Sequence, residues 1–260
     1  ANPVGLYNFH IDRTLPVFSD ISPQSNTYSN NPLFEFTLSE DLYYGKVIFT
    51  EQDGSLNPGR TVEFEMDSAD FSQGFHARDT LGNQLPLVDG AVYTIQLVGR
   101  DIASNWSDTT LITDYHYDIT LPITTILDPL DSSFINTNAV TINNSEKLLA
   151  VEMYWINPQG DAKKVALRTR DLTVGENRLI MYAISLNENT RYDLLFNTID
   201  LAGNTNQTRI IEGIIYDVTL PKLTITKPGN SSYINNKAIS YIISEPLIQA
   251  AVTWEIKTGI

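Results

Sequence analysis

Short runs of aromatic and β-branched residues alternate with polar positions along most of the chain. Residues 93–98 read Tyr-Thr-Ile-Gln-Leu-Val, so apolar side chains fall at every second position, as in a β-strand with one buried face. Residues 33–38, 46–50 and 151–155 are similarly rich in strand-forming residues. Turn pairs such as Asp53-Gly54 separate these runs. Helical periodicity is missing, so the pattern predicts an all-β chain built from short strands.

The same landmarks return about every 100 residues, which marks an internal repeat. The sequence Asp-x-Thr-Leu-Pro ends at Pro16, again at Pro122 and again at Pro221. A second proline, an aromatic residue, a Ser-Glu pair and a further aromatic residue follow each of these prolines at constant offsets. They are Pro23, Tyr28, Ser39-Glu40 and Phe49; Pro129, Phe134, Ser145-Glu146 and Trp155; and Pro228, Tyr233, Ser244-Glu245 and Trp254.

This register divides the chain into four parts. Residues 1–12 are expected to be the last strand of a preceding repeat, and residues 13–118 and 119–217 are two complete repeats. Residues 218–260 form an incomplete third repeat that supplies strands A to C only. Three strands leave one layer uncovered, so we expect residues 218–260 of this chain by itself to be disordered or to aggregate.

About seven short strands in about 100 residues predict tandem immunoglobulin-like or fibronectin-III-like antiparallel β-sandwiches. A β-solenoid has much shorter repeats. On the third strand of each repeat, Phe49, Trp155 and Trp254 are expected to fill the space between the two sheets. Tyr93 and Tyr192 fall at the start of strand F, where a tyrosine corner is expected.

Two motifs carry a family resemblance. Residues 200–204 read Asp-Leu-Ala-Gly-Asn and residues 217–221 read Asp-Val-Thr-Leu-Pro, while residues 101–105 are a looser copy with Ser for Gly. Both motifs resemble the bacterial immunoglobulin-like tandem repeats of large cell-surface adhesins. The resemblance covers nearly the whole chain and implies an extracellular, cell-surface protein whose repeats contact their neighbours. It does not specify function, because such repeats also occur in S-layer proteins and as spacers in secreted enzymes.

Composition excludes several classes of function. Asp and Glu number 31 against 17 Lys and Arg, a net charge of −14, which disfavours nucleic acid as a partner. There is no cysteine, hence no disulfide, no thiol catalysis and no thiolate metal site. The sequence contains no run of about 18 apolar residues, so this segment is not expected to span a membrane. Motifs of hydrolases, P-loop enzymes and zinc proteases are also missing, so no catalytic residue is predicted and we expect no enzyme activity.

Acidic residues recur at one end of each predicted sandwich. Strand directions place the B–C loop and the F–G loop at the end where the linker enters, and each loop carries an acid. The predicted groups are Asp12, Glu40 and Asp101 in the first repeat, Asp118, Glu146 and Asp200 in the second, and Asp217 with Glu245 in the third. Such oxygen ligands suit Ca²⁺, and uncompensated carboxylates would repel one another. The resemblance also implies calcium, since calcium rigidifies junctions in several adhesins of this kind.

A purely structural interpretation of these acids stays open beside the calcium site. Asp at the mouth of a turn accepts a hydrogen bond from a backbone N–H two residues on, and no Asp-x-Asp-x-Asp-Gly calcium loop is present.

The expected function is a stalk or spacer segment of a long modular protein, with any host, cell or glycan surface bound by other parts of that protein. One alternative is a module that binds glycan or protein through residues 67–89, an insert with Phe71, Phe75 and His76 that the fold would not need. A second is an accessory domain of a secreted enzyme or an S-layer component.

Overall fold

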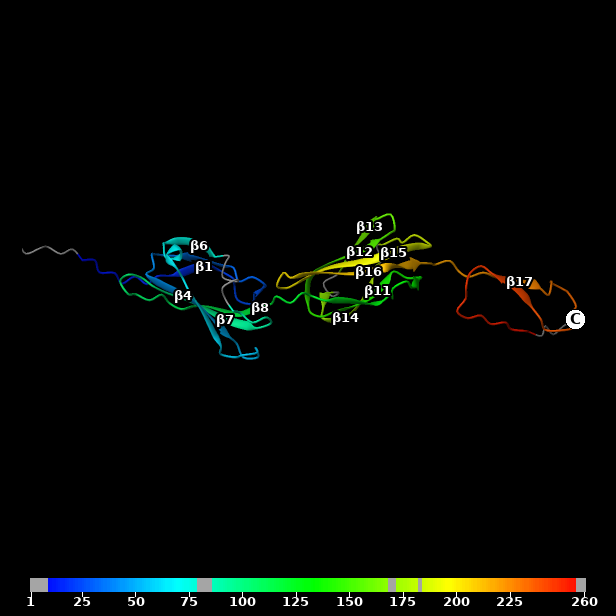
Figure 1. Cartoon of the computed structure of the whole chain (residues 1–260), viewed down its shortest axis with the longest axis horizontal. Coiled ribbons are helices and arrows are strands. Elements are labelled where there is room, and N and C mark those ends of the chain that lie inside the picture. Colours follow the sequence, from blue (N-terminus) through cyan, green and yellow to red (C-terminus); the bar gives the residue numbers. More distant parts are fainter. Residues whose placement is uncertain (1–8, 79–85, 168–171, 182–183, 256–260) are drawn as a thin grey trace, which may run out of the picture.

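The computed structural model describes residues 9–78, 86–167, 172–181 and 184–255. These residues form a succession of β-sheet units along the long axis of the molecule (Figure 1). One 3-10 turn, η1 (Ser68–Asp70), lies between strands of the first unit, and none of the described residues is in an α-helix. The prediction of an all-β fold is therefore confirmed. In the described ranges, no helix has the length and apolar composition needed to cross a bilayer.

The first unit is a sandwich of a three-stranded and a five-stranded sheet. The first sheet has the order β1 (Phe18–Ser22), β3 (Phe34–Leu38), β6 (Gly74–Arg78). The second has the order β2 (Tyr28–Ser29), β8 (Thr110–Tyr117), β7 (Val92–Arg100), β4 (Tyr44–Glu51), β5 (Thr61–Glu65). All neighbours pair antiparallel except β2 with β8.

The second unit repeats this topology strand for strand. Its smaller sheet has the order β9 (Thr124–Asp128), β11 (Ala139–Asn144), β14 (Gly175–Ile180). Its larger sheet has the order β10 (Phe134–Ile135), β16 (Thr205–Tyr216), β15 (Thr190–Asp200), β12 (Leu148–Ile156), β13 (Ala162–Ala166). The sequence repeat is thus a structural repeat, and the sheet order is that of an immunoglobulin-like or fibronectin-III-like sandwich.

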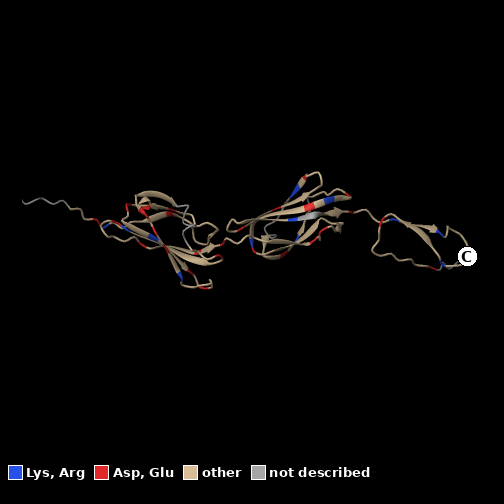
Figure 2. Ribbon diagram, in the orientation of Figure 1, with Lys and Arg blue, Asp and Glu red and all other residues tan. Residues whose placement is uncertain are grey.

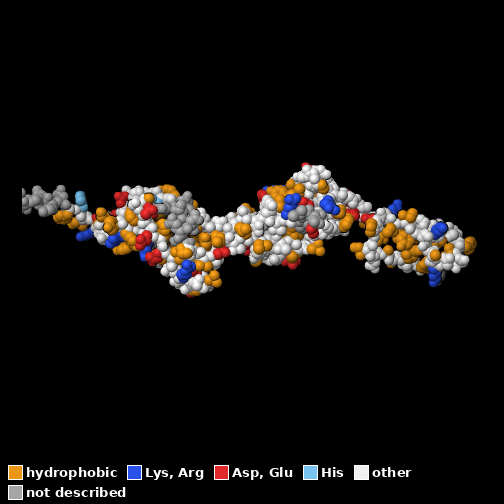
Figure 3. Space-filling view, viewed as in Figure 1, with side chains coloured by type: hydrophobic (Ala, Val, Ile, Leu, Met, Phe, Trp, Pro, Cys, Tyr) orange, Lys and Arg blue, Asp and Glu red, His pale blue; other side chains and the backbone are white. Residues whose placement is uncertain are grey.

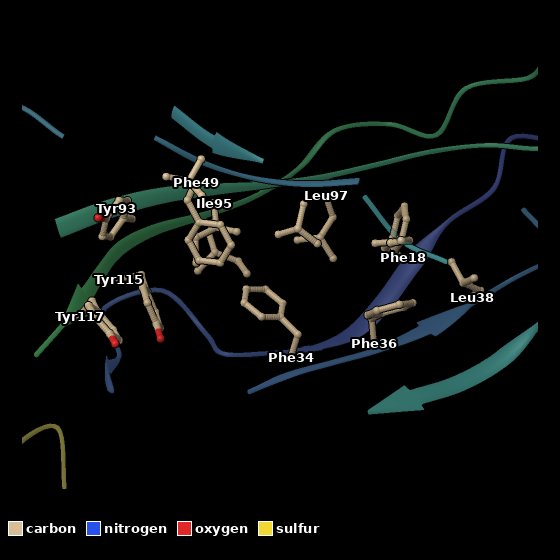
Figure 4. Close-up of a cluster of buried hydrophobic side chains, with 14 of the residues drawn as sticks. Phe18, Phe34, Phe36, Leu38, Phe49, Tyr93, Ile95, Leu97, Tyr115 and Tyr117 are labelled. Atoms are coloured by element: carbon tan, nitrogen blue, oxygen red, sulfur yellow. The ribbon is translucent and has the colours of Figure 1, made fainter. Parts of the chain in front are cut away.

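Each unit has its own hydrophobic core between the sheets. In Figure 4, Phe34, Phe36 and Leu38 of β3 face Ile95 and Leu97 of β7 across the interior. Phe49 is fully buried, and so is its counterpart Trp155, whose ring lies edge-on to Tyr192 with centroids 6.0 Å apart. The predicted burial of Trp155 is confirmed, and with it the strand register.

Both predicted tyrosine corners are present. The hydroxyl oxygen of Tyr93 accepts a hydrogen bond from the backbone N–H of Val88 at 2.8 Å. The hydroxyl oxygen of Tyr192 accepts one from the backbone N–H of Asn187 at 2.9 Å. In each complete unit the bond ties the start of strand F, which is β7 in the first unit and β15 in the second, to the loop before it.

The prediction that residues 67–89 are an insert that the fold does not need is wrong. The strand β6 lies within this segment and pairs with β3 over five residues. Its counterpart β14 pairs with β11 in the second unit, so both sandwiches use this strand. Phe71 packs against the core, and His76 stacks on Phe36 with ring centroids 5.2 Å apart. Part of the segment, residues 79–85, lies outside the described residues.

The third unit is a two-stranded sheet of β17 (Leu223–Lys227) and β18 (Ser240–Ile243). The expected third strand is not formed over residues 251–255, because no described strand lies beside it to accept its hydrogen bonds. Trp254 is accordingly 54% exposed, and hydrophobic side chains gather on the visible face of this unit in Figure 3. At the other end of the chain, residues 9–12 form no strand, and residues 1–8 lie outside the described residues.

Candidate functional site

Figure 2 marks acidic residues in red along the ribbon of both complete units. Acidic residues from three separate segments meet where the linker enters each of these two sandwiches. In the second unit these are Asp118 of the linker, Glu146 of the turn between β11 and β12, and Asp200 at the end of β15. One carboxylate oxygen from each lies within 4.8 Å of the others. Asp12, Glu40 and Asp101 meet in the same way in the first unit. The structure therefore brings together the members of both predicted three-acid groups.

An asparagine of the F–G loop orients the most buried acid of each group. Asp200 is fully buried, and its carboxylate accepts hydrogen bonds from the backbone N–H and the side-chain amide of Asn204, each at 2.8 Å. The same amide also donates to the backbone carbonyl of Asp118 at 2.9 Å, so it joins the loop to the linker. Asn105 makes both bonds to Asp101 in the first unit and donates to the carbonyl of Asp12. This explains why the motif ends in Asn.

The linker acids also cap their own turns. Asp118 accepts a hydrogen bond from the backbone N–H of Thr120 at 2.9 Å, and Asp12 accepts one from Thr14 at 2.9 Å. The structural role considered for these acids is thus present. It does not use the whole carboxylate, because an ionised carboxylate has about four acceptor positions.

Two of the glutamates have a buried oxygen without such a partner, whereas Glu146 hydrogen-bonds to Ser145. The Oε1 atom of Glu40 is inaccessible to solvent and receives no hydrogen bond, and the same holds for Glu245 in the third unit. Burial, together with the charges of Asp118 and Asp200, raises the pKa of Glu146. Burial and the charges of Asp12 and Asp101 likewise raise the pKa of Glu40. Each group therefore gathers more negative charge than its surroundings compensate.

The third unit holds part of this arrangement. Asp217 and Glu245 line one hollow at its start, beside Thr219 and Pro221. Among the described residues no third acid joins them, because strands F and G of this unit do not occur there.

A second acid–linker contact was not predicted from the sequence. Asp89 accepts hydrogen bonds from the backbone N–H of Ile119 at 2.7 Å and from the hydroxyl of Thr120 at 2.6 Å. Glu188 does the same one unit later, with Thr219 donating through its N–H at 3.0 Å and its hydroxyl at 2.6 Å. We call these two contacts the linker clamps. An available signal was that both acids lie four residues before the corner tyrosine of their unit.

Neither a family model nor a curated protein matches this sequence. Several solved structures resemble it distantly. The FN1–FN3 domains of chicken CNTN1 are 11% identical, with a TM-score of 0.32, over 74% of this chain and 66% of that one. A tetra-tandem repeat in the extending region of a large adhesion protein is 17% identical, with a TM-score of 0.34, over 81% of this chain and 52% of that one. A 1.5-MDa bacterial ice-binding adhesin is 12% identical, with a TM-score of 0.33, over 84% of this chain and 71% of that one.

These likenesses are distant. The chain spans between about half and two thirds of the length of the first two structures. The assignment of the sandwich fold rests on the sheet order and cores described above.

Proposed function

We propose that this chain is a spacer segment of a modular, extracellular cell-surface protein, and that Ca²⁺ bound by the acidic groups fixes the linker to each sandwich. The observation that carries the proposal is the recurrence of three converging carboxylates at the same place in both complete units. The spacer role itself involves no reaction.

The chemistry of the donors supports a hard divalent cation. Ca²⁺ takes six to eight oxygen ligands, and carboxylates and backbone carbonyls are its usual ones. The cation would supply the positive charge that the buried oxygen of Glu40 lacks. It would also offset the repulsion by Asp118 and Asp200 that, after burial, raises the pKa of Glu146.

The position of the acids explains why a cation would stiffen the chain. Asp118 belongs to the linker, whereas Glu146 and Asp200 belong to the sandwich, so one ion would join the two. A direct hydrogen bond between the two units also stiffens the chain at this junction. The side-chain amide of Asn30 in the first unit donates to the side-chain oxygen of Asn204 in the second at 3.0 Å. Linkers without such ties let domains move relative to each other.

Thermal unfolding with Ca²⁺ and with EDTA tests the proposal. At about 100 times its dissociation constant, a ligand bound only by the folded state stabilises it by about 2.7 kcal/mol, so Ca²⁺ should raise the melting temperature. The double variant Glu40→Gln/Glu146→Gln should lose this increase. Glu176→Gln, at an exposed position on β14, is the matched control and should keep it. Equal melting temperatures of the unmodified chain in Ca²⁺ and EDTA would overturn the metal site.

A further inference from the structure

The outer face of the five-stranded sheet differs in chemistry between the two complete units. In the second unit its polar side chains pair with one another across the strands. Glu152 bonds to Lys164, Asp193 to Arg209 at 2.7 Å, and Asn197 to Gln207 at 2.9 Å. This face satisfies its own charges and hydrogen-bonding groups, which is typical of a solvated surface.

The corresponding face of the first unit carries an aromatic cluster around one cation. Tyr44 lies opposite Arg100 on the neighbouring strand, and Arg100 lies opposite Trp106 in an isolated bridge. The guanidinium carbon of Arg100 lies 5.5 Å from the ring centroid of Tyr43 and 5.6 Å from that of Trp106. The rings of Tyr44 and Trp106 meet edge-on at 6.1 Å. We call Tyr43, Tyr44, Arg100 and Trp106 the aromatic platform.

The fold does not require this platform. The second unit has the same strands, and its residues at the four positions are Leu149, Ala150, Ile199 and Thr205. Leu149 remains 58% exposed although the first unit precedes it, so a preceding unit does not cover this position. A set of residues that one repeat has and its structural copy lacks points to a function other than folding.

The platform is accessible and its cation has no acidic partner. Tyr43 is 62% exposed and Trp106 is 51% exposed. Among the described residues, no carboxylate lies within ion-pair distance of Arg100, although the chain has 31 acids. The Nε atom of Arg100 is inaccessible to solvent and has no acceptor in the protein, so only the outer guanidinium nitrogens can reach a ligand. Exposed ring faces beside unused guanidinium donors can contact a ligand that has both apolar C–H groups and acceptor oxygens.

We propose that the aromatic platform binds a neutral pyranose saccharide. The C–H face of a pyranose ring would stack on Trp106 or Tyr43, and ring hydroxyls would accept hydrogen bonds from Arg100. This inference concerns a different site from the proposed cation site and does not depend on it.

Size and charge distinguish this ligand from others. Aromatic side chains bury about 150–250 Å² each when fully covered, so the exposed parts of Tyr43 and Trp106, with a smaller part of Tyr44, offer roughly 250 Å². A stable protein interface needs about 800 Å² per partner. The acidic group of Asp12, Glu40 and Asp101 lies at the same end of the sheet and would repel an acidic saccharide. Lys46 of β4 is already paired with Glu63 of β5. The net charge of −14 disfavours acidic saccharides.

Titration of the full chain with saccharides tests the proposal. Calorimetry would use hexasaccharides of β-1,4-glucose, β-1,4-N-acetylglucosamine and α-1,6-mannose, with a galacturonic acid hexamer as the acidic arm. We expect at least one neutral hexamer to bind, and Trp106→Ala to weaken this binding at least about tenfold. Thr205→Ala, the same position in the second unit, should leave it unchanged. An unaltered melting temperature of Trp106→Ala shows that the loss is not unfolding.

Three outcomes would overturn the assignment. The first is that none of the neutral hexamers binds, and the second is that Trp106→Ala binds as well as the unmodified chain. The third is that sedimentation shows self-association which Trp106→Ala removes while no saccharide binds, which would assign the platform to a second copy of the chain.

Discussion

Single residues carry much of the stability of a sandwich that has no disulfide. Trp155 fills the interior of the second unit, with its indole N–H donating to the sulfur of Met181 at 3.0 Å. Phe49 takes the same position in the first unit and contacts Phe34, Tyr93 and Tyr115 edge-on. A large ring at this position therefore joins both sheets of each unit, as the third-strand aromatic was expected to do.

Truncation of this ring should be among the most costly changes in the second unit. Trp155→Ala removes a fully buried ring and leaves a cavity, so it should lower the free energy of unfolding by about 3–5 kcal/mol. A domain has about 5–15 kcal/mol in total. Leu149→Ala, at an exposed position of the same strand, should change it by less than about 0.5 kcal/mol. Urea unfolding of both variants measures the difference, and equal costs would contradict the buried position of Trp155.

At the scale of elements, the linker between the first and second units is held from both sides. The sandwich that follows contacts it through Asn204, and the unit that precedes contacts it through the linker clamp of Asp89. The clamp comes from the turn before strand F, where the corner tyrosine fixes the loop. The orientation of the linker thus depends on side chains of two units and not on its proline alone.

The Asp89 clamp should depend on pH in a defined direction. Burial favours the neutral carboxyl, but hydrogen bonds from the Thr120 hydroxyl and the Ile119 and Thr120 N–H groups outweigh it and lower the pKa of Asp89. A lowered pKa in the folded state means that the clamp stabilises above the ordinary Asp pKa and is lost as the pH falls through the lowered one.

An NMR titration of the Ile119 and Thr120 amide protons measures this loss. The midpoint should lie below about 3.9, the ordinary value for Asp. Asp89→Asn carries no titrating group, so it should remove the transition and serves as the control. A midpoint at or above the ordinary value would show that the carboxylate does not hold the linker.

At the scale of the whole molecule, the three units differ in how completely they are covered. The first two bury their apolar residues between two sheets. The third unit, in the described residues, has one two-stranded sheet whose side chains are all exposed. Two-stranded sheets are marginal in water without a second layer.

Amide hydrogen exchange should therefore separate the third unit from the others. We expect amides of Leu223–Lys227 to exchange with protection factors below about 10, because opening this sheet costs little free energy. Amides of β15, in the centre of the second unit, should exchange only when the whole unit unfolds. Equal protection in β17 and β15 would show that the third unit is stable as it stands.

The sequence by itself determined the features that depend on local period and on spacing. Alternation of apolar and polar residues is a property of one strand, so it predicted strands, and the constant offset that places Trp155 on the third strand predicted its burial. Constant offsets between repeats, combined with strand direction, predicted which end of the sandwich Asp118, Glu146 and Asp200 would share.

Only the tertiary structure decided which distant segments contact each other. The pairing of β6 with β3 makes Gly74–Arg78 part of the sandwich, although loops of unequal length conceal the correspondence with β14. Asp89 reaches a linker about thirty residues away. Tyr43 and Trp106 lie beside Arg100 because the pairing of β4 with β7 and the Arg100–Trp106 bridge bring them together. Such contacts depend on the path of the backbone between the residues, and no local pattern of side chains encodes that path.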